Sequence, residues 1–273
     1  MAKVNWARLA EGAIVPLVLL LFWQAICDFG FVDPRKLPSP LAVAVRWWSY
    51  IYPEAPFDSA KDFAPAWAFS GEFFRDAAGS LYRVIAGFAV GALLALPFGL
   101  AMGASEKAYR YFNPLLQVLR PIPPIAYIPL SILWFGLGNP PAIFLIALGA
   151  FFPVLINTIA GVRAVDSIYM RAARNLGASQ FTIFRRVILP AATPYILSGV
   201  RIGIGTAFIV VIVAEMIAVN NGLGFRILEA REYFWSDKII AGMFSIGFIG
   251  LAIDTVVNKI NNHLLRWHRG LES

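Results

Sequence analysis

The sequence predicts an all-α polytopic membrane protein with six transmembrane helices, and two observations support this. Of the 273 residues, 59% are hydrophobic and only 14% are charged, whereas a soluble domain carries roughly 25% charged residues. The hydrophobic residues also gather in runs close to the ~20 residues that a helix needs to cross a bilayer. We predict these spans at 13–26, 81–103, 114–135, 141–162, 195–219 and 239–260.

The first span has two interpretations. Basic residues ahead of an apolar run at 13–26 resemble a secretory signal peptide. However, Trp23, Gln24 and Asp28 occupy the place of a small-residue cleavage site, so we predict a retained span. Cys27 is the only cysteine, which excludes an internal disulfide and a metal site built from several cysteines.

The stretch between the first two spans differs from the spans in composition. Pro34, Pro38 and Pro40 punctuate it, and 41–52 is compatible with an amphipathic helix whose tryptophans lie at the headgroup level. Residues 53–76 are polar and aromatic, and we place them outside the membrane. We therefore divide the chain into 1–80 (the first span and a periplasmic or interfacial connection), 81–262 (the core transmembrane domain) and 263–273 (a basic tail).

The second and third predicted spans each have a distinctive residue pattern. Gly87, Gly91, Ala95 and Gly99 recur every four residues on one face of the second span, which permits close approach of another helix. The third span contains four prolines between 121 and 129 and must bend or break. We expect a loop at 104–113, a tight turn at 136–140 and an outer loop at 220–238.

The distribution of Lys and Arg predicts the orientation. The N-terminus, the 104–113 loop, the 163–190 segment and the C-terminus carry most of them on one side, which the positive-inside rule makes cytoplasmic. The same rule accounts for the net charge of +7, so we expect no nucleic-acid partner.

The cytoplasmic segment 163–190 has the pattern of two short helices. Asp166 or Ser167 can cap a first helix, and Gly177 is placed to end it in the left-handed conformation. Ser179 can cap a second helix, which we expect Pro190 to end, and we expect the next membrane segment to start there. On composition alone, a helix pair resting on anionic lipid headgroups is an equally good interpretation.

At these residues the sequence resembles a known family. Ala172-Ala173, Gly177 and Val187-x-Leu189-Pro190 follow the signature of the transmembrane permease subunits of binding-protein-dependent ABC importers, with two departures. Arg171 stands where the family has Glu, and Val187 replaces Ile. The segments 120–136, 213–216 and 222–224 look like the nitrate, sulfonate and taurine branch, and the likeness covers about residues 80–270.

The resemblance implies the type I ABC importer permease fold in a bacterial inner membrane. It implies a homodimer with two ABC ATPase subunits and a periplasmic substrate-binding protein, importing a small anion or sulfonate. The chain would be a transport subunit and not an enzyme, in agreement with the lack of a Gly-x-x-x-x-Gly-Lys-[Ser/Thr] phosphate loop. The coupling helix that contacts the ATPase would include Arg171, Ala172, Ala173, Leu176, Gly177 and Phe181.

Candidates for the translocation path come from irregular or ionisable positions inside the spans. The proline-rich bend is either pore-lining or a packing kink, and the arginines at 120 and 201 either attract an anion or reach the headgroups. Aromatic residues at 134 and 135 suit a gate or an interfacial belt equally well. The candidates are Arg120, Pro123, Pro124, Tyr127, Trp134 and Glu215.

Two rival functions use the same sequence differently. A proton-coupled secondary transporter would use Glu215 and Asp254, since ionisable groups within spans are costly and mark pathways. The alternative is structural: Glu215 pairs with an Arg or with backbone near the outer end of its span, and Asp254 lies near the inner end of the sixth span, close to Lys259. An intramembrane enzyme would need paired catalytic groups at one depth, which the spans lack. We expect no metal and no cofactor, since His263 and His268 have no second ligand at helical spacing.

Overall fold

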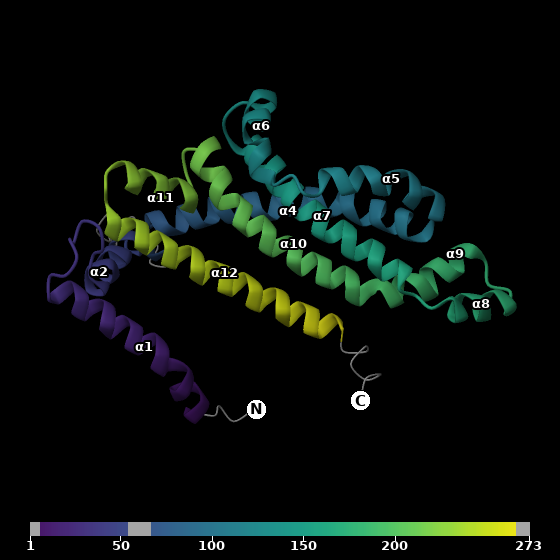
Figure 1. Ribbon diagram of the computed structural model, residues 1–273, viewed down its shortest axis with the longest axis horizontal. Helices are drawn as coiled ribbons and strands as arrows, with labels where there is room; N and C mark the ends of the chain where they lie inside the picture. The colour runs from purple at the N-terminus through teal and green to yellow at the C-terminus, as the bar shows by residue number, and fades with distance from the viewer. Residues whose placement is uncertain (1–5, 54–66, 266–273) are drawn as a thin grey trace. The chain divides into compact units, whose positions relative to one another are not determined.

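The computed structural model describes residues 6–53 and 67–265, and within these ranges every regular element is a helix (Figure 1). The helices are α1 (Trp6–Asp28), α2 (Pro40–Ile51), α4 (Glu72–Ala104), α5 (Glu106–Leu119), α6 (Ile128–Phe135), α7 (Asn139–Arg163), α8 (Ser167–Asn175), α9 (Gln180–Ile183), α10 (Leu189–Ala218), α11 (Leu223–Glu232) and α12 (Ser236–Leu264). A 3-10 turn, Pro124–Tyr127, precedes α6, and a π-helical turn, Phe184–Ile188, precedes α10. The all-α prediction is confirmed.

The helices form two compact units. The first unit consists of Met1–Ala77 and Arg226–Ile246, and the second of Ala78–Phe225 and Gly247–Ser273. The division near residue 80 that the sequence predicts differs from this, because Arg226–Ile246 packs with the N-terminal part of the chain. Ion pairs of Arg226 with Glu72 and Asp76 connect these distant parts of the sequence.

Arg226 is the centre of the first unit. Its guanidinium contacts three carboxylates: Asp76 at 2.7 Å, Glu229 at 3.0 Å and Glu72 at 3.1 Å. Burial acts to lower the pKa of Arg226, but the bonds to Asp76 and Glu229 outweigh it and raise the pKa. Tyr50 of α2 donates its hydroxyl to Asp76 at 2.9 Å. This buried network therefore connects α2, the start of α4 and α11.

Ionisation of the Tyr50 phenol should make the stability of the first unit depend on alkaline pH. Its burial, followed by the charge of Asp76 and the hydrogen bond to it, raises the pKa of the phenol above its ordinary value. A raised pKa in the folded state means that the stabilisation is complete below about pH 10 and is lost as the pH rises through the folded-state pKa. We expect Tyr50→Phe to flatten the fall of Tm between about pH 9.5 and 11.5, measured in detergent. An unchanged alkaline slope would contradict the role of Tyr50.

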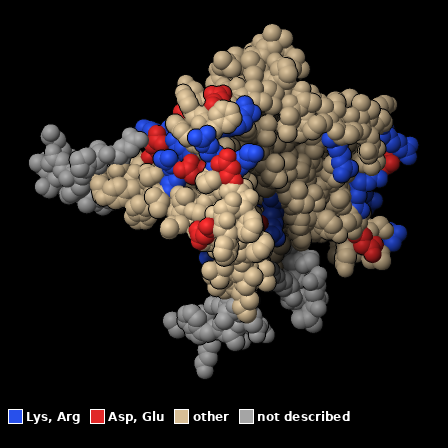
Figure 2. Space-filling model, turned by 60° about the vertical axis from the view of Figure 1, so that its left-hand side comes forward, with Lys and Arg blue, Asp and Glu red and all other residues tan. Residues whose placement is uncertain are grey.

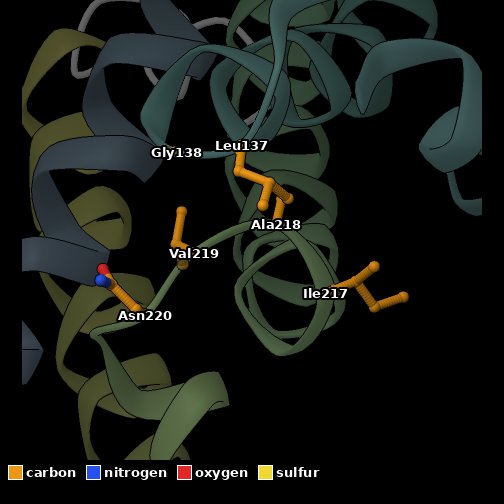
Figure 3. Close-up of a pocket in the computed structure, with 6 residues that line it drawn as sticks. All are labelled: Leu137, Gly138, Ile217, Ala218, Val219 and Asn220. Carbon is orange, nitrogen blue, oxygen red and sulfur yellow. The ribbon is translucent and has the colours of Figure 1, made fainter. Parts of the chain in front are cut away.

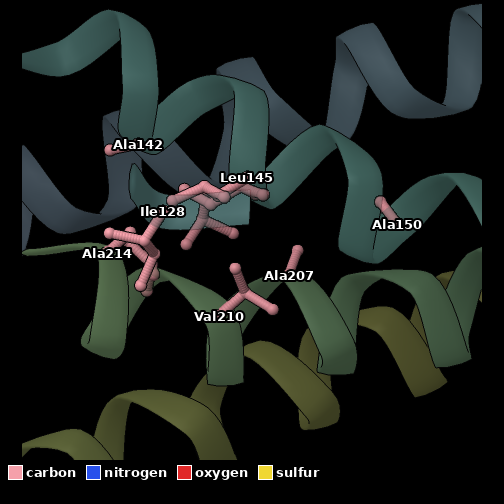
Figure 4. Packing of buried hydrophobic residues seen from close by; sticks show 10 residues of the cluster. Ile128, Ala142, Leu145, Ala150, Ala207, Val210 and Ala214 are labelled. Carbon is pink, nitrogen blue, oxygen red and sulfur yellow. The ribbon is translucent and has the colours of Figure 1, made fainter. Parts of the chain in front are cut away.

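The core of the second unit lies between α7 and α10, with contributions from α4 and α6 (Figure 4). Leu145 of α7, Val210 of α10 and Ile128 of α6 meet in it, together with small residues such as Ala142 and Ala207. Small residues let the helix backbones approach closely, which is how helices associate in lipid, where the hydrophobic effect between them is weak.

The small-residue face of the second predicted span contacts α7, as its spacing predicts. A Cβ atom added at Gly87 would lie 2.6 Å from Cβ of Ile146, and one at Gly99 would lie 2.8 Å from Cβ of Thr158. At Gly91 the added atom would overlap the carbonyl oxygen of Ala147. Because these separations are below van der Waals contact, glycine is required for this helix pair to pack.

The structure agrees with the number of spans only in part. Among the described residues, four helical stretches are long and apolar enough to cross a membrane: α4, α7, the continuous stretch 180–218, and α12. The apolar part of α1, Gly12–Asp28, is shorter. The third predicted span is two helices bent by 82°, α5 and the 124–135 segment. Figure 2 shows broad areas of surface without charged side chains, as contact with lipid requires.

Three boundary predictions are wrong. The expected loop at 104–113 is mostly helix, because Ser105 caps α5 through a bond from the Ala108 amide to its hydroxyl. The expected outer loop at 220–238 contains α11. Pro190 does not end a helix, although a long span does start there as expected. It occupies the first turn of α10, where the missing amide hydrogen is tolerated, and the preceding turn widens to a π-helix.

Candidate functional site

The segment between α7 and α10 forms two helices joined by a turn. Asp166 caps α8 by accepting from the Ile168 amide at 2.8 Å, and Ser179 caps α9 by accepting from the Thr182 amide at 3.2 Å. Between them Gly177 has φ of 77°, and the Ala178 amide donates back to the Ala173 carbonyl at 3.0 Å. The predicted caps and the left-handed glycine are thus present.

The turn presents apolar side chains to the surroundings. Leu176 is 88% exposed and Phe181 is 70% exposed. Ile168 and Tyr169 of α8 are also exposed, as is the predicted site residue Ala172, whereas Ala173 is half-buried. Apolar side chains are thus exposed on a short basic segment, which gives the segment the character of a contact surface. Arg171 is exposed, and nothing in the structure explains why Arg stands there.

The predicted path residues around the proline-rich bend lie in different surroundings. Arg120 is an exposed residue at the end of α5, and Pro123 and Pro124 begin the 3-10 turn that redirects the chain. Tyr127 is half-buried and packs against the core between α7 and α10. Trp134 is exposed and its ring lies 5.9 Å from that of Phe144, centroid to centroid.

A pocket of about 280 Å³ lies where the turn before α7 meets the end of α10 (Figure 3). The Gly138 amide donates to the Ala218 carbonyl at 2.7 Å, and Leu137 extends toward Ala218, whereas Ile217 points away from Val219. Positive φ values at Gly136 and Gly138 produce the predicted tight turn. None of the predicted path residues lines this pocket.

Glu215 is fully buried in a polar network, away from any surface. It forms an ion pair with Arg83 at 2.7 Å, and the exposed fractions of the two side chains are 0% and 3%. The Ser80 hydroxyl and the Gly224 amide both donate to its second oxygen at 2.9 Å. Glu215 is therefore saturated with donors in this conformation, and α4, α10 and the start of α11 meet around it.

Arg83 was missed by sequence reasoning. Its Nε donates to Asn139 Oδ1 at 2.7 Å, and its terminal nitrogens donate to the carbonyl and the side-chain oxygen of Asn221. The sequence feature that could have identified Arg83 is its position: a basic residue at the beginning of the second apolar run, where an unpaired charge would be costly. Asn139, Glu215 and Asn221, all far from Arg83 in sequence, converge on this guanidinium, which no spacing rule reveals.

Asp254 also has a different partner from the one expected. It pairs with Arg201 of α10, with Nη2 to Oδ1 at 3.0 Å, rather than with Lys259. Helical geometry places a partner on a neighbouring helix as easily as one on the same helix, so the nearness of Lys259 in sequence was misleading.

Known proteins resemble this chain over most of its length. The profile of the family described as "Binding-protein-dependent transport system inner membrane component" matches residues 87–270. The chain is 34% identical over 251 residues to the taurine transport system permease protein of Escherichia coli (strain K12), covering 92% of this chain and 87% of that protein. It is 32% identical over 258 residues to the nitrate import permease protein of Leptolyngbya laminosa, covering 94% and 88%.

The fold has a relative among solved structures. A chain of the MetNI methionine ABC transporter, solved in inward facing conformations, superposes with a TM-score of 0.59 and 19% sequence identity. The alignment covers 70% of this chain and 94% of that chain. At this identity the comparison concerns the fold alone.

Proposed function

Because the chain belongs to the family of binding-protein-dependent transport system inner membrane components, we propose that it forms the translocation path for a small oxyanion. It is a permease subunit of an ABC importer, and ATP hydrolysis belongs to a separate ATPase subunit. The substrate class rests on the taurine and nitrate permeases that resemble it. A sulfonate and nitrate share the chemistry of a compact anion with three oxygen acceptors.

The segment α8–α9 is the proposed coupling surface. The observation that carries this proposal is the exposure of Leu176 and Phe181 on a capped helix–turn–helix between two long spans. Exposed apolar anchors surrounded by polar residues are typical of protein–protein contacts. In a full transporter two copies of the permease would each present this surface to an ABC ATPase, on the cytoplasmic side. A periplasmic substrate-binding protein would deliver the anion on the opposite side.

Glycine at 177 allows a matched test of coupling. Gly177 and Gly30 both have positive φ, 77° and 70°, and a side chain at either would meet no atom within 4 Å. Gly177→Val and Gly30→Val therefore introduce similar backbone strain without a clash. When the chain is co-expressed with the ABC ATPase of its own transport system, we expect Gly177→Val to reduce ATPase co-purification about tenfold and uptake of taurine or nitrate similarly.

The control and a second variant complete this experiment. Gly30→Val should leave co-purification within about twofold of the unmodified chain, because Gly30 lies outside the proposed surface. Leu176→Ser removes the most exposed anchor without changing the backbone and should also weaken co-purification. Equal ATPase recovery with Gly177→Val, Leu176→Ser and Gly30→Val would show that α8–α9 does not bind the ATPase. Arg171→Glu then asks whether that charge affects the choice of partner.

A further inference from the structure

An exposed ion pair connects α10 with the part of α12 that belongs to the second unit. Arg201 Nε and Nη2 lie 3.2 and 3.0 Å from Asp254 Oδ1, and Asn258 Nδ2 donates to the other carboxylate oxygen at 2.9 Å. Each charged side chain is 49% exposed. Unlike the buried pair of Arg83 and Glu215, this one is accessible from outside the chain.

The position of the pair along the spans is informative. At 1.5 Å per residue, Arg201 lies roughly 25 Å from the Ala218 end of α10, and Asp254 lies roughly 27 Å from the Ser236 end of α12. These two ends are joined through residues 219–235, and the predicted topology places them on the same side of the membrane. The hydrocarbon core is about 30 Å thick. With roughly 25–27 Å of a core of about 30 Å behind it, the pair lies close to the opposite boundary of the core, where a half-exposed charged pair is stabilised by water, headgroups or protein and not by acyl chains.

The residues beside the pair leave room for a small ligand. Ser198 and Gly205 lie three residues before and four residues after Arg201, so they share its face of α10, and both are exposed. A side chain at Gly205 would meet no atom within 4 Å. A cavity of about 70 Å³, lined partly by Gly205 and Gly250, lies directly beside the ion pair.

We propose that Arg201, held by Asp254, is a transient contact for the transported oxyanion on the water-facing side of α10 and α12. This inference rests on the proposed function. The guanidinium presents a planar fork of N–H donors, which sulfonate or nitrate oxygens accept as the Asp254 carboxylate does. The anion would replace Asp254 on the fork, and Asp254 would return when the anion moves on.

The carboxylate makes this contact suitable for transport rather than storage. An unpaired arginine in a span would be costly in the empty state and would hold an anion tightly. Conduction requires a site that is favourable enough to enter and weak enough to leave. Competition from Asp254 lowers the net affinity for the passing anion, which satisfies both requirements with two residues.

Charged thiol reagents test this face without any partner protein. In a Cys27→Ser background the chain has no cysteine, so Ser198→Cys or Gly205→Cys supplies a single thiol. The anionic probe is 2-sulfonatoethyl methanethiosulfonate, itself a sulfonate, and the cationic probe is its trimethylammonium analogue. Membranes are opened by freeze–thaw so that both sides are reached. Leu93→Cys, at an exposed apolar position of α4, is the control.

The expected result is a preference for the anion that depends on the ion pair. Both thiols on α10 should react. Each probe's rate is first divided by its rate with a free thiol in solution. After this correction, the anionic probe should react about tenfold faster than the cationic one. Adding Arg201→Gln with Asp254→Asn should remove the preference. Labelling no faster than at Leu93→Cys, or labelling without charge preference, would overturn the inference.

Uptake measurements separate this inference from the proposed function. In vesicles containing the complete transporter, Arg201→Gln with Asp254→Asn should lower taurine or nitrate uptake at least fivefold. The matched pair Arg46→Gln with Asp237→Asn, which neutralises another partly exposed ion pair, should keep it. Absence of uptake of any anion by the unmodified transporter would refute the proposed substrate class, whereas the labelling result stands by itself. Normal uptake by the first double variant would show that the pair is only structural.

Discussion

Replacing Arg83 by alanine is expected to lower the free energy of unfolding by about 3–5 kcal/mol, because it leaves the fully buried Glu215 carboxylate without its cation. The Ser80 hydroxyl and the Gly224 amide would still donate to Glu215, but neither carries a charge. Asn139 and Asn221 would lose their shared donor at the same time. Denaturation in mixed detergent micelles measures the change.

Two further variants show whether the pair stabilises the chain or also takes part in transport. Arg83→Met with Glu215→Leu removes both charges and should recover most of the lost stability, since well-packed apolar residues commonly replace a buried pair. Removing the exposed Arg46–Asp237 pair by Arg46→Ala should cost no more than about 1 kcal/mol. If Arg83→Ala costs as little as Arg46→Ala, the network does not stabilise the fold.

The same variants address the rival function. A proton-coupled transporter that uses Glu215 would lose all transport in Arg83→Met with Glu215→Leu, even if the protein folds. An importer driven by a separate ATPase should keep ATP-dependent uptake, provided that Glu215 only holds α4 and α10 together. Loss of uptake in a stable double variant would instead support the prediction that Glu215 lies on the translocation path.

Gly91→Leu is expected to disrupt the packing of α4 on α7, with a loss of about 2–3 kcal/mol. A side chain at Gly91 meets the backbone carbonyl of Ala147, which cannot rotate away as a flexible side chain could. The two helices must therefore separate along their contact, and the neighbouring contacts at Gly87 and Gly99 weaken as well. Thermal unfolding in detergent should show a lower Tm.

Gly247→Leu is the matched control for that variant. Gly247 also lies in a long span, but an added side chain would meet no atom within 4 Å. Replacing a helical glycine without a clash should leave stability unchanged or slightly higher. A Tm for Gly91→Leu equal to that of Gly247→Leu would mean that the close approach of α4 and α7 is not needed.

Several features of this chain could be predicted from the sequence because they depend on neighbouring residues. The caps at Asp166 and Ser179, the left-handed Gly177 and the tight turn at 136–138 all depend on a few adjacent residues. The glycine spacing of the second span depends on helical periodicity, and it correctly predicted a close helix contact. The prolines of the third span predicted a break, although its size of 82° depends on what surrounds it.

By itself, the sequence determined that the chain is an all-helical membrane protein with a capped, basic helix pair between two spans. Apolar run length, helix caps and glycine conformation are local properties, so they can be read along the chain. Only the tertiary structure decided the partners of the charges. Arg83 with Glu215, Arg201 with Asp254, and Arg226 with Asp76 each join residues more than fifty positions apart. Pairing of charges depends on which helices become neighbours, and that is set by packing of the whole chain.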